Sequence, residues 1–354
     1  MRNHIRRAHV EKAKKRQDDF VIAGQTIKPG QKLTFDLPVT RLYTYAPINI
    51  PVHVIHGKYA GPRMFVSAAI HGDELNGVEI IHRLLEHKGL SRLRGTLIAI
   101  PIVNIHGFIS HSRYLPDRRD LNRSFPGSTT GSLAARIAHL FMHEIVMQCD
   151  YGIDLHTAAI HRDNLPQIRA NLEDELTLEL AKEFDVPVIL NANLRDGSLR
   201  ESAAEQGIPM LLYEGGEALR FNEVVIRAGL RGVINVLRKL KMLTTPKRSR
   251  ITNIDPIIAR SSSWVRAPGS GVLRTMVKMG QRVNRGDKVG LIVDPIGEQK
   301  LDITTPHDGI VIGRTNLPLA NEGDALLHIA RFGQIDTAEE RVEEFQEVFQ
   351  PDTM

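Results

Sequence analysis

Short apolar runs alternate with amphipathic stretches through the middle of the chain. The runs predict buried strands, and apolar positions that recur every three to four residues predict helices. Their alternation from Arg63 to about Lys241 predicts an α/β fold with a sheet covered by helices on both faces. The predicted strands are Met64–Ile70, Thr96–Val103, Tyr151–Leu155, Val186–Leu190 and Pro209–Tyr213, and the predicted helices are Leu75–His87, Leu133–Gln148, Glu173–Glu183 and Ala218–Lys241.

Both ends of the chain have a different pattern. Phe20 to His56 alternates short apolar stretches with turn signals, which predicts β-hairpins. A predicted linker at 244–250 is followed by short β runs punctuated by Gly and Asp, and then by an amphipathic helix at 337–349. We therefore expect a basic N-terminal segment with β-hairpins (1–50), a main domain (51–245) and a smaller C-terminal all-β domain (255–354).

Composition and charge narrow the class of protein. The 354 residues are 42% apolar and 25% charged, which is ordinary for a globular protein of one or two domains. The absence of a long apolar run predicts no membrane partner, and the single cysteine, Cys149, fits a cytoplasmic protein. The formal charge is +5, with basic residues concentrated in Met1 to Arg16. A nucleic-acid arm is one interpretation, but no recognition motif follows, so we expect no nucleic-acid partner.

The first candidate site lies where the first strand of the main domain ends. His71 follows that strand and Glu74 begins the next predicted helix. The carboxyl ends of strands in open α/β sheets face the crevice that holds the site. An imidazole and a carboxylate suit zinc, and a catalytic zinc takes three protein ligands plus water. This pair therefore predicts two ligands of one zinc ion.

The third ligand is expected from another strand end. His156 ends the predicted strand that begins at Tyr151, which repeats the context of His71. Asp154 lies two residues earlier on the same face, where it either orients an imidazole or accepts a structural hydrogen bond. His106 and His161 are rival candidates for the third ligand.

A long loop and a later strand end supply the remaining candidates. Asn122 and Arg123 offer amide and guanidinium donors that match a carboxylate. An arginine earlier in this loop is expected to stabilise an oxyanion, and the candidates are Arg113, Arg118 and Arg119. Glu214 ends an apolar strand and is the candidate general base, with Glu217 as the alternative.

These motifs occur together in an order that resembles the succinylglutamate desuccinylase/aspartoacylase family. The matching segments are His71-x-x-Glu74, Asp120-Leu-Asn122-Arg123-x-Phe125-Pro126, Asp154-Leu-His156 and Glu214-x-Gly216. The resemblance covers roughly Val52 to Lys241 and implies a zinc-dependent deacylase with a carboxypeptidase-like mixed sheet flanked by helices.

The resemblance also implies roles for single residues. It implies that His71, Glu74 and His156 bind one Zn²⁺ per chain, that Glu214 is the general base, and that Asn122 and Arg123 hold a substrate carboxylate. Arg113 resembles the arginine that contacts the scissile carbonyl. Because its spacing to Asn122 is longer here than in aspartoacylase-type members, Arg118 and Arg119 remain alternatives.

The C-terminal part resembles a biotinyl/lipoyl-type barrel-sandwich in the segments Ala267-Pro-Gly-Ser-Gly-Val-Leu273 and Val277 to Asp287. The carrier hairpin with its modified lysine is replaced by Asp294-Pro-Ile-Gly-Glu-Gln-Lys300, so we expect a packing module or a lid without a covalent cofactor.

The expected function is removal of a short acyl group, acetyl or succinyl, from an N-acylated amino acid or diamino acid that carries a carboxylate. The rivals are a metallocarboxypeptidase for small peptides and a non-catalytic ligand-binding protein with a metal site. The sequence leaves open whether the chain forms a homo-oligomer.

Overall fold

The computed structural model describes residues 15–191, 196–245 and 256–349. Most of the basic N-terminal segment and of the predicted linker therefore lies outside the described residues. The helices are α2 (Asn76–Leu85), α3 (Ile105–Ile109), α4 (Leu133–Glu144), α5 (Glu175–Glu183), α6 (Leu199–Glu205), α7 (Glu223–Lys239) and α8 (Ile335–Phe349). None of the helices in these ranges is both long enough and apolar enough to span a membrane.

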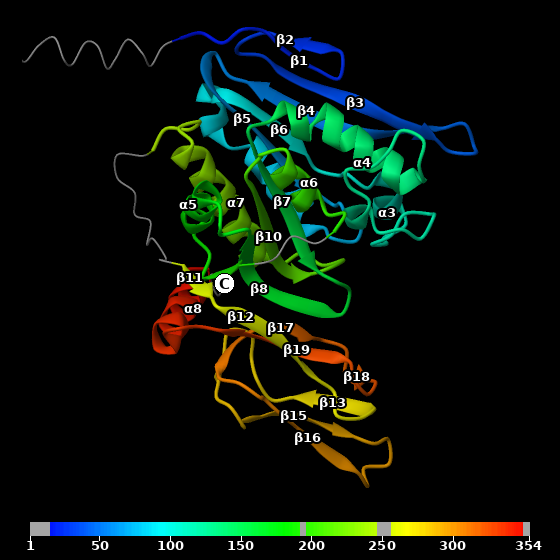
Figure 1. Cartoon of the computed structure of the whole chain (residues 1–354), viewed down its shortest axis with the longest axis vertical. Coiled ribbons are helices and arrows are strands. Elements are labelled where there is room, and N and C mark those ends of the chain that lie inside the picture. The colour runs from blue at the N-terminus through cyan, green and yellow to red at the C-terminus, as the bar shows by residue number, and fades with distance from the viewer. Residues whose placement is uncertain (1–14, 192–195, 246–255, 350–354) are drawn as a thin grey trace, which may run out of the picture.

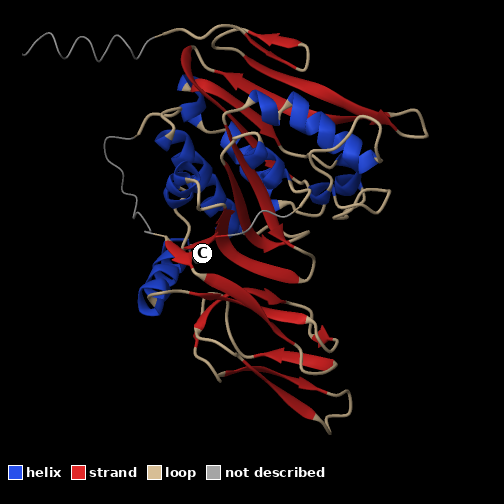
Figure 2. Ribbon diagram, in the orientation of Figure 1, coloured by secondary structure: helices blue, strands red, loops and turns tan. Residues whose placement is uncertain are grey.

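A thirteen-stranded mixed sheet organises the chain (Figures 1 and 2). Its centre is the parallel group β10–β7–β5–β6, with β8 antiparallel beside β10 and the β3–β4 hairpin beside β6. The strands before residue 218 are β1 (Phe20–Ile22), β2 (Gln25–Ile27), β3 (Lys32–Arg41), β4 (Pro47–His56), β5 (Tyr59–Ala68), β6 (Arg94–Ile100), β7 (Tyr151–Ala158), β8 (Arg162–Ala170), β9 (Val188–Asn191) and β10 (Met210–Glu217). Of these, β1 and β2 form a separate two-stranded sheet. The strand ends that carry the candidate residues are therefore neighbours.

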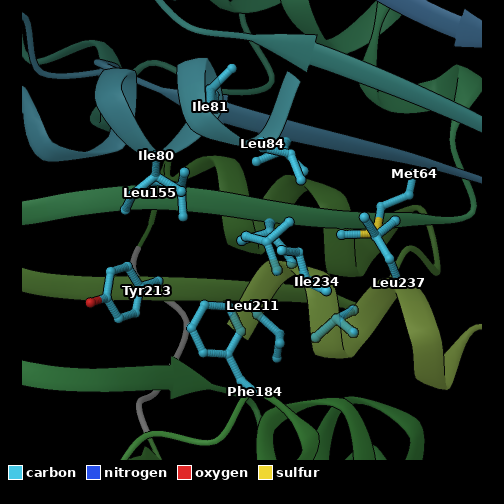
Figure 3. Close-up of a cluster of buried hydrophobic side chains, with 14 of the residues drawn as sticks. Met64, Ile80, Ile81, Leu84, Leu155, Phe184, Leu211, Tyr213, Ile234 and Leu237 are labelled. Atoms are coloured by element: carbon cyan, nitrogen blue, oxygen red, sulfur yellow. The ribbon is translucent and has the colours of Figure 1, made fainter. Parts of the chain in front are cut away.

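Two apolar cores cover the two faces of this sheet. Alternation along β5 sends Met64 and Val66 into one core and Phe65 into the other. The first core packs against α2, α5 and α7, with residues such as Leu84 and Phe184 fully buried (Figure 3). The second packs against α4 and α6. Helices on both faces confirm the predicted mixed α/β architecture.

Five of the strands after residue 256 continue the main sheet, and we call residues 257–331 the C-terminal β region. Strand β17 pairs with β8 of the main sheet, and β19 and β12 extend the order beyond it (Figure 1). Four other strands form a separate sheet in the order β16–β15–β13–β18. The strands are β11 (Ile257–Ala259), β12 (Ser261–Arg266), β13 (Gly271–Thr275), β14 (Arg282–Val283), β15 (Lys288–Val293), β16 (Lys300–Thr304), β17 (Gly309–Thr315), β18 (Leu319–Ala320) and β19 (Ala325–Arg331). The strand-rich C-terminal region is as expected, while its barrel-sandwich form and the domain boundaries stay predictions.

The predicted elements differ from the structure in several places: β8, α3 and α6 were not predicted, and one helix begins later than expected. Strand β8 falls in a segment that the sequence left unassigned, because Pro166 interrupts it and its polar residues mask the alternation. The last predicted helix of the main domain begins at Glu223 rather than Ala218. Asn222 caps it there, because its side chain accepts a hydrogen bond from the Val225 backbone N–H.

Candidate metal centre and active site

The candidate residues gather where three neighbouring parallel strands end. In the register of the sheet, Ser67 of β5 lies beside Asp154 of β7, and His156 of β7 lies beside Glu214 of β10. Parallel strands direct their carboxyl ends to one edge of a sheet, where α/β folds build their sites. The sheet therefore brings together side chains that are far apart in the sequence.

His71 and Glu74 lie on the tight turn between β5 and α2. Ala69 has a φ of 51°, which turns the chain sharply after the strand. Gly72 packs directly on the backbone of α3, where a Cβ would lie 1.9 Å from the carbonyl carbon of Gly107. A larger residue at 72 would separate the turn from α3 and displace both candidate ligands.

The two imidazoles and one carboxylate form a compact buried triad. The Nδ1 atoms of His71 and His156 lie 2.7 and 2.8 Å from the two oxygens of Glu74. One ligand atom from each residue lies within 4.8 Å of the others. Two imidazole nitrogens and a carboxylate oxygen are a donor set that zinc prefers. The triad thus offers three ligands to one ion.

Further carboxylates hold the outer nitrogen of each imidazole. Asp154 Oδ2 lies 2.6 Å from His156 Nε2, and Asp120 Oδ1 lies 3.1 Å from His71 Nε2. Asp154 also accepts a hydrogen bond from Ser67 Oγ at 2.7 Å. Carboxylates in this position fix the orientation of metal-binding histidines and raise their basicity. Asp154 is therefore placed to orient the His156 ring.

The charges around the triad favour a bound cation. Burial by itself would lower the pKa values of His71 and His156, but the adjacent carboxylates outweigh burial and raise both pKa values. Burial would raise the pKa of Glu74, yet the imidazoles hold it far below its usual range. Buried carboxylates that stabilise positive charge on two imidazoles also stabilise a divalent cation in the same place. The residues present therefore fit zinc.

A cavity of about 770 Å³ extends from the triad. Asn122, Arg123, Arg113 and Glu214 line it together with the three candidate ligands. Asn122 is fixed because its Oδ1 accepts a hydrogen bond from the Leu199 backbone N–H at 2.9 Å, and Arg113 pairs with Asp120 at 2.9 Å. The cavity is large enough for an acylated amino acid and a further group.

Other sequence candidates lie away from this cavity. Arg118 and Arg119 are exposed and do not line it, and the nearest carboxylate to Arg119 is Asp117 at 3.8 Å. Glu217 accepts a hydrogen bond from the His161 backbone N–H at 3.1 Å, outside the cavity. His106 lies on α3 and is likewise absent from the lining. The structure thus brings only Arg113 of the three loop arginines to the triad.

Several residues that line the cavity were not predicted from the sequence. Strand β8 contributes Asn164, whose Nδ2 donates to Glu214 Oε1 at 2.9 Å, and Arg169, which pairs with Glu214 Oε2 at 2.5 Å. Helix α6 contributes Arg200, and the C-terminal β region contributes Trp264 and His328. The turn residues Asn171 and Asp174 after β8 were the available clue to that strand. No local pattern marked the residues of the C-terminal β region.

His328 predicts a pH dependence of folding stability. Burial, reinforced by the charge of Arg169, lowers its pKa to about 3 from an ordinary value of 6.5. Unfolding below pH 6.5 therefore takes up a proton, and stability falls as the pH decreases. From pH 6 to pH 5 we expect the free energy of unfolding to fall about 1 kcal/mol more in the wild type than in His328→Phe. Urea titrations at both pH values measure this, and equal losses would contradict it.

The chain belongs to the succinylglutamate desuccinylase/aspartoacylase family. The model of that family's catalytic domain matches residues 60–240, which contain all the candidate ligands and Glu214. This confirms the family resemblance drawn from the four motifs.

Individual relatives extend the similarity over most of the chain. The N-alpha-acetyl-L-2,4-diaminobutyric acid deacetylase of Halomonas elongata is 27% identical over 300 residues, which cover 81% of this chain and 86% of the relative. Two solved structures have a TM-score of 0.76 and 25% identity and cover 85% of this chain. They are a succinylglutamate desuccinylase/aspartoacylase from Rhodobacter sphaeroides, 96% covered, and a product-bound ectoine utilization protein EutE from Ruegeria pomeroyi, 95% covered.

Proposed function

We propose that the protein is a zinc-dependent amidohydrolase that removes a short acyl group from an N-acylated amino acid or diamino acid. The observation that carries this proposal is the convergence of His71, Glu74 and His156 within one cavity that also holds Glu214. The deacetylase of Halomonas elongata and the family supply the reaction type.

The proposed metal site consists of the Nδ1 atoms of His71 and His156 and the carboxylate of Glu74. Zinc bound there would polarise the acyl carbonyl and lower the pKa of a water molecule. Asp154 and Asp120 keep each Nδ1 directed at the site by holding the opposite nitrogen.

Glu214 is the proposed general base. Its carboxylate accepts the proton of the attacking water and returns it to the departing amine nitrogen. Asn164 and Arg169 hold one oxygen each, so the carboxylate has a defined position before substrate arrives. A fixed acceptor removes the orientational cost of proton transfer.

Two further groups orient the substrate. Asn122 and Arg123 have donors that match its carboxylate, and Arg113 directs a guanidinium towards the triad, 3.5 Å from Glu74 Oε1. We assign Arg113 to the acyl oxygen, where it stabilises the charge that develops during attack.

A substrate screen tests this proposal. The zinc-loaded and the chelator-treated proteins are incubated with N-acetyl and N-succinyl amino acids and with blocked dipeptides, and products are separated by liquid chromatography. We expect release from acylated amino acids by the zinc-loaded protein alone. Release only from dipeptides would indicate a carboxypeptidase, and binding without release would indicate a ligand-binding protein.

A glycine in the C-terminal β region, Gly313, leaves the space that the Asn164 side chain occupies. Gly313 of β17 lies directly beside Asn164, and a Cβ at 313 would lie 2.6 Å from Asn164 Oδ1 and 3.1 Å from His328 Cβ. Contacts shorter than 3.0 Å force a neighbour to move. Here that neighbour is the side chain that holds Glu214.

We therefore expect Gly313→Ala to lower kcat by about 10- to 100-fold, the effect of a small displacement of a reacting group. Added to Asn164→Ala, it should lower kcat no further, because the displaced group is already absent. Gly309→Ala is the control on the same strand: its Cβ would meet the Ala330 carbonyl oxygen, so it should lower the Tm without changing kcat. Equal effects on kcat in the Asn164→Ala and wild-type backgrounds would contradict this account.

A further inference from the structure

Two histidines that the metal centre does not use lie side by side on α4 (Figure 1). The ring centres of His139 and His143 are 4.1 Å apart, and the ring planes are tilted by 46° to each other. Neither residue belongs to the triad of His71, Glu74 and His156, and neither lines the active-site cavity. The chain therefore carries a second pair of neighbouring imidazoles on a different element.

The spacing of the pair places both imidazoles on one face of the helix. Each residue of an α-helix turns by about 100°, so residues four apart are offset by only about 40°. Ala138, Phe141 and Met142 are buried in the second core, and they fix which face of α4 is turned inward. Two histidines at this spacing on a helix hold one zinc ion in a common metalloprotease motif. The pair thus has the geometry of a two-ligand chelate.

The ring nitrogens of the pair are free to accept a ligand from solvent. His143 is exposed and His139 is half-buried. Among the residues that the structure describes, no hydrogen bond or ion pair involves either ring, and each ring contacts the other. Both nitrogens of His71 and of His156, by contrast, contact carboxylates. An imidazole without a protein partner keeps a lone pair for a metal ion.

The surroundings of the pair favour a cation. His143 lies in the last turn of α4, where carbonyl groups without helical partners give the helix end a partial negative charge. The Glu144 carboxylate adds a negative charge beside it in the chain. Arg136, about one turn before His139, donates its Nε–H to the Gly131 carbonyl at 3.0 Å, so its guanidinium is directed towards the beginning of the helix.

The pair lies beside a loop that leads away from the active site. Gly127 and Ser128 follow Arg123, which lines the cavity. The Ser128 backbone N–H donates to the Ala135 carbonyl at 3.0 Å, and a Cβ at Gly127 would lie 2.3 Å from the backbone nitrogen of His139. An ion that joins the last two turns of α4 would therefore stabilise the surface on which this loop packs.

We propose that His139 and His143 form a second metal site, which binds a late first-row divalent cation through one nitrogen of each ring, with water completing the coordination. Imidazole suits Cu²⁺, Ni²⁺ and Zn²⁺, and affinity in this series is highest for Cu²⁺. The triad offers three buried ligands and this site offers two at the surface, so the triad takes zinc first. Occupation of the second site does not depend on the proposed function.

A nickel titration of the zinc-loaded protein tests the proposal. Binding is measured by calorimetry, and metal analysis of the same sample confirms that the zinc stays bound. We expect the wild type to bind a further nickel ion and His143→Gln to bind it about 10²-fold more weakly, because the gain from a second linked ligand is lost. Nickel should raise the Tm of the wild type but not of this variant, because the ion binds only the folded helix.

Two controls separate the pair from other histidines. His82→Gln removes an exposed helical imidazole whose two nitrogens face different carboxylates, those of Glu79 and Glu86, so nickel affinity should match that of the wild type. The double variant His143→Gln/Glu144→His keeps the number of histidines, but the new ring lies about 140° around the helix from His139. Its nickel affinity should stay as low as that of His143→Gln.

Three results would overturn the proposal. They are a wild type that binds no nickel beyond the zinc, equal nickel affinity in the wild type and His143→Gln, and recovery of wild-type affinity in the double variant, which would show that the spacing is irrelevant. Because the titration measures binding alone, each of these results leaves the proposed hydrolysis untouched. In the absence of nickel, kcat of His143→Gln should stay within about 2-fold of the wild type, as for an exposed change away from the reacting groups.

Discussion

Glu214→Gln is expected to lower kcat by about 10²- to 10⁴-fold, the usual contribution of a positioned general base. Glutamine keeps the shape of the side chain and its contact with Asn164, but it has no carboxylate to take a proton. Because Glu214 is not one of the three residues of the triad, zinc content should stay at one ion per chain. Steady-state kinetics with metal analysis of the same sample measures both quantities.

Glu217→Gln is the matched control for that experiment. Glu217 is on the same strand, but its carboxylate contacts the His161 backbone N–H and Asn316 outside the cavity. We expect kcat within about 2-fold of the wild type, as for a change away from the reacting groups. A fully active Glu214→Gln beside an inactive Glu217→Gln would transfer the role of base to Glu217.

His156→Ala should lose zinc and, with it, activity by at least about 10³-fold, since several kcal/mol of transition-state stabilisation depend on the ion. The variant leaves Glu74 and His71, and two ligands do not complete the usual catalytic site of three. It also leaves Asp154 buried without the imidazole that it contacts at 2.6 Å, so the Tm should fall. Metal analysis after gel filtration gives the zinc content.

His161→Ala separates a ligand from a nearby histidine. His161 follows β7 and is exposed, and its backbone rather than its ring makes the contact with Glu217. Zinc content and kcat should both match those of the wild type. Loss of zinc from His161→Ala with retention in His156→Ala would reverse the assignment of the third ligand.

The triad was predictable from the sequence because each member lies at or just after the end of an apolar strand. His71 follows β5, and His156 lies near the end of β7. Apolar strands are recognised without knowing the fold, and parallel strands carry their ends to one edge. Strands β5 and β7 are neighbours in the sheet, so their ends lie side by side. The two local patterns, an apolar strand followed by His71 and another that contains His156, were therefore enough to predict that these residues meet.

The support of Glu214 was not predictable in the same way. Asn164 and Arg169 belong to β8, whose central Pro166 and polar residues give no clear alternation. Arg260, Trp264 and His328 reach the cavity only because β17 pairs with β8 and extends the main sheet. That pairing joins strands more than a hundred residues apart, and the local periodicity of a strand does not indicate which distant strand it pairs with.

Anomalous diffraction at the zinc edge from a crystal of the zinc-loaded protein shows directly which atoms bind the ion. We expect a single strong peak within about 2.0–2.2 Å of His71 Nδ1, His156 Nδ1 and a carboxylate oxygen of Glu74. A zinc-loaded crystal with no peak at these atoms, or with its peak on other residues, would contradict it.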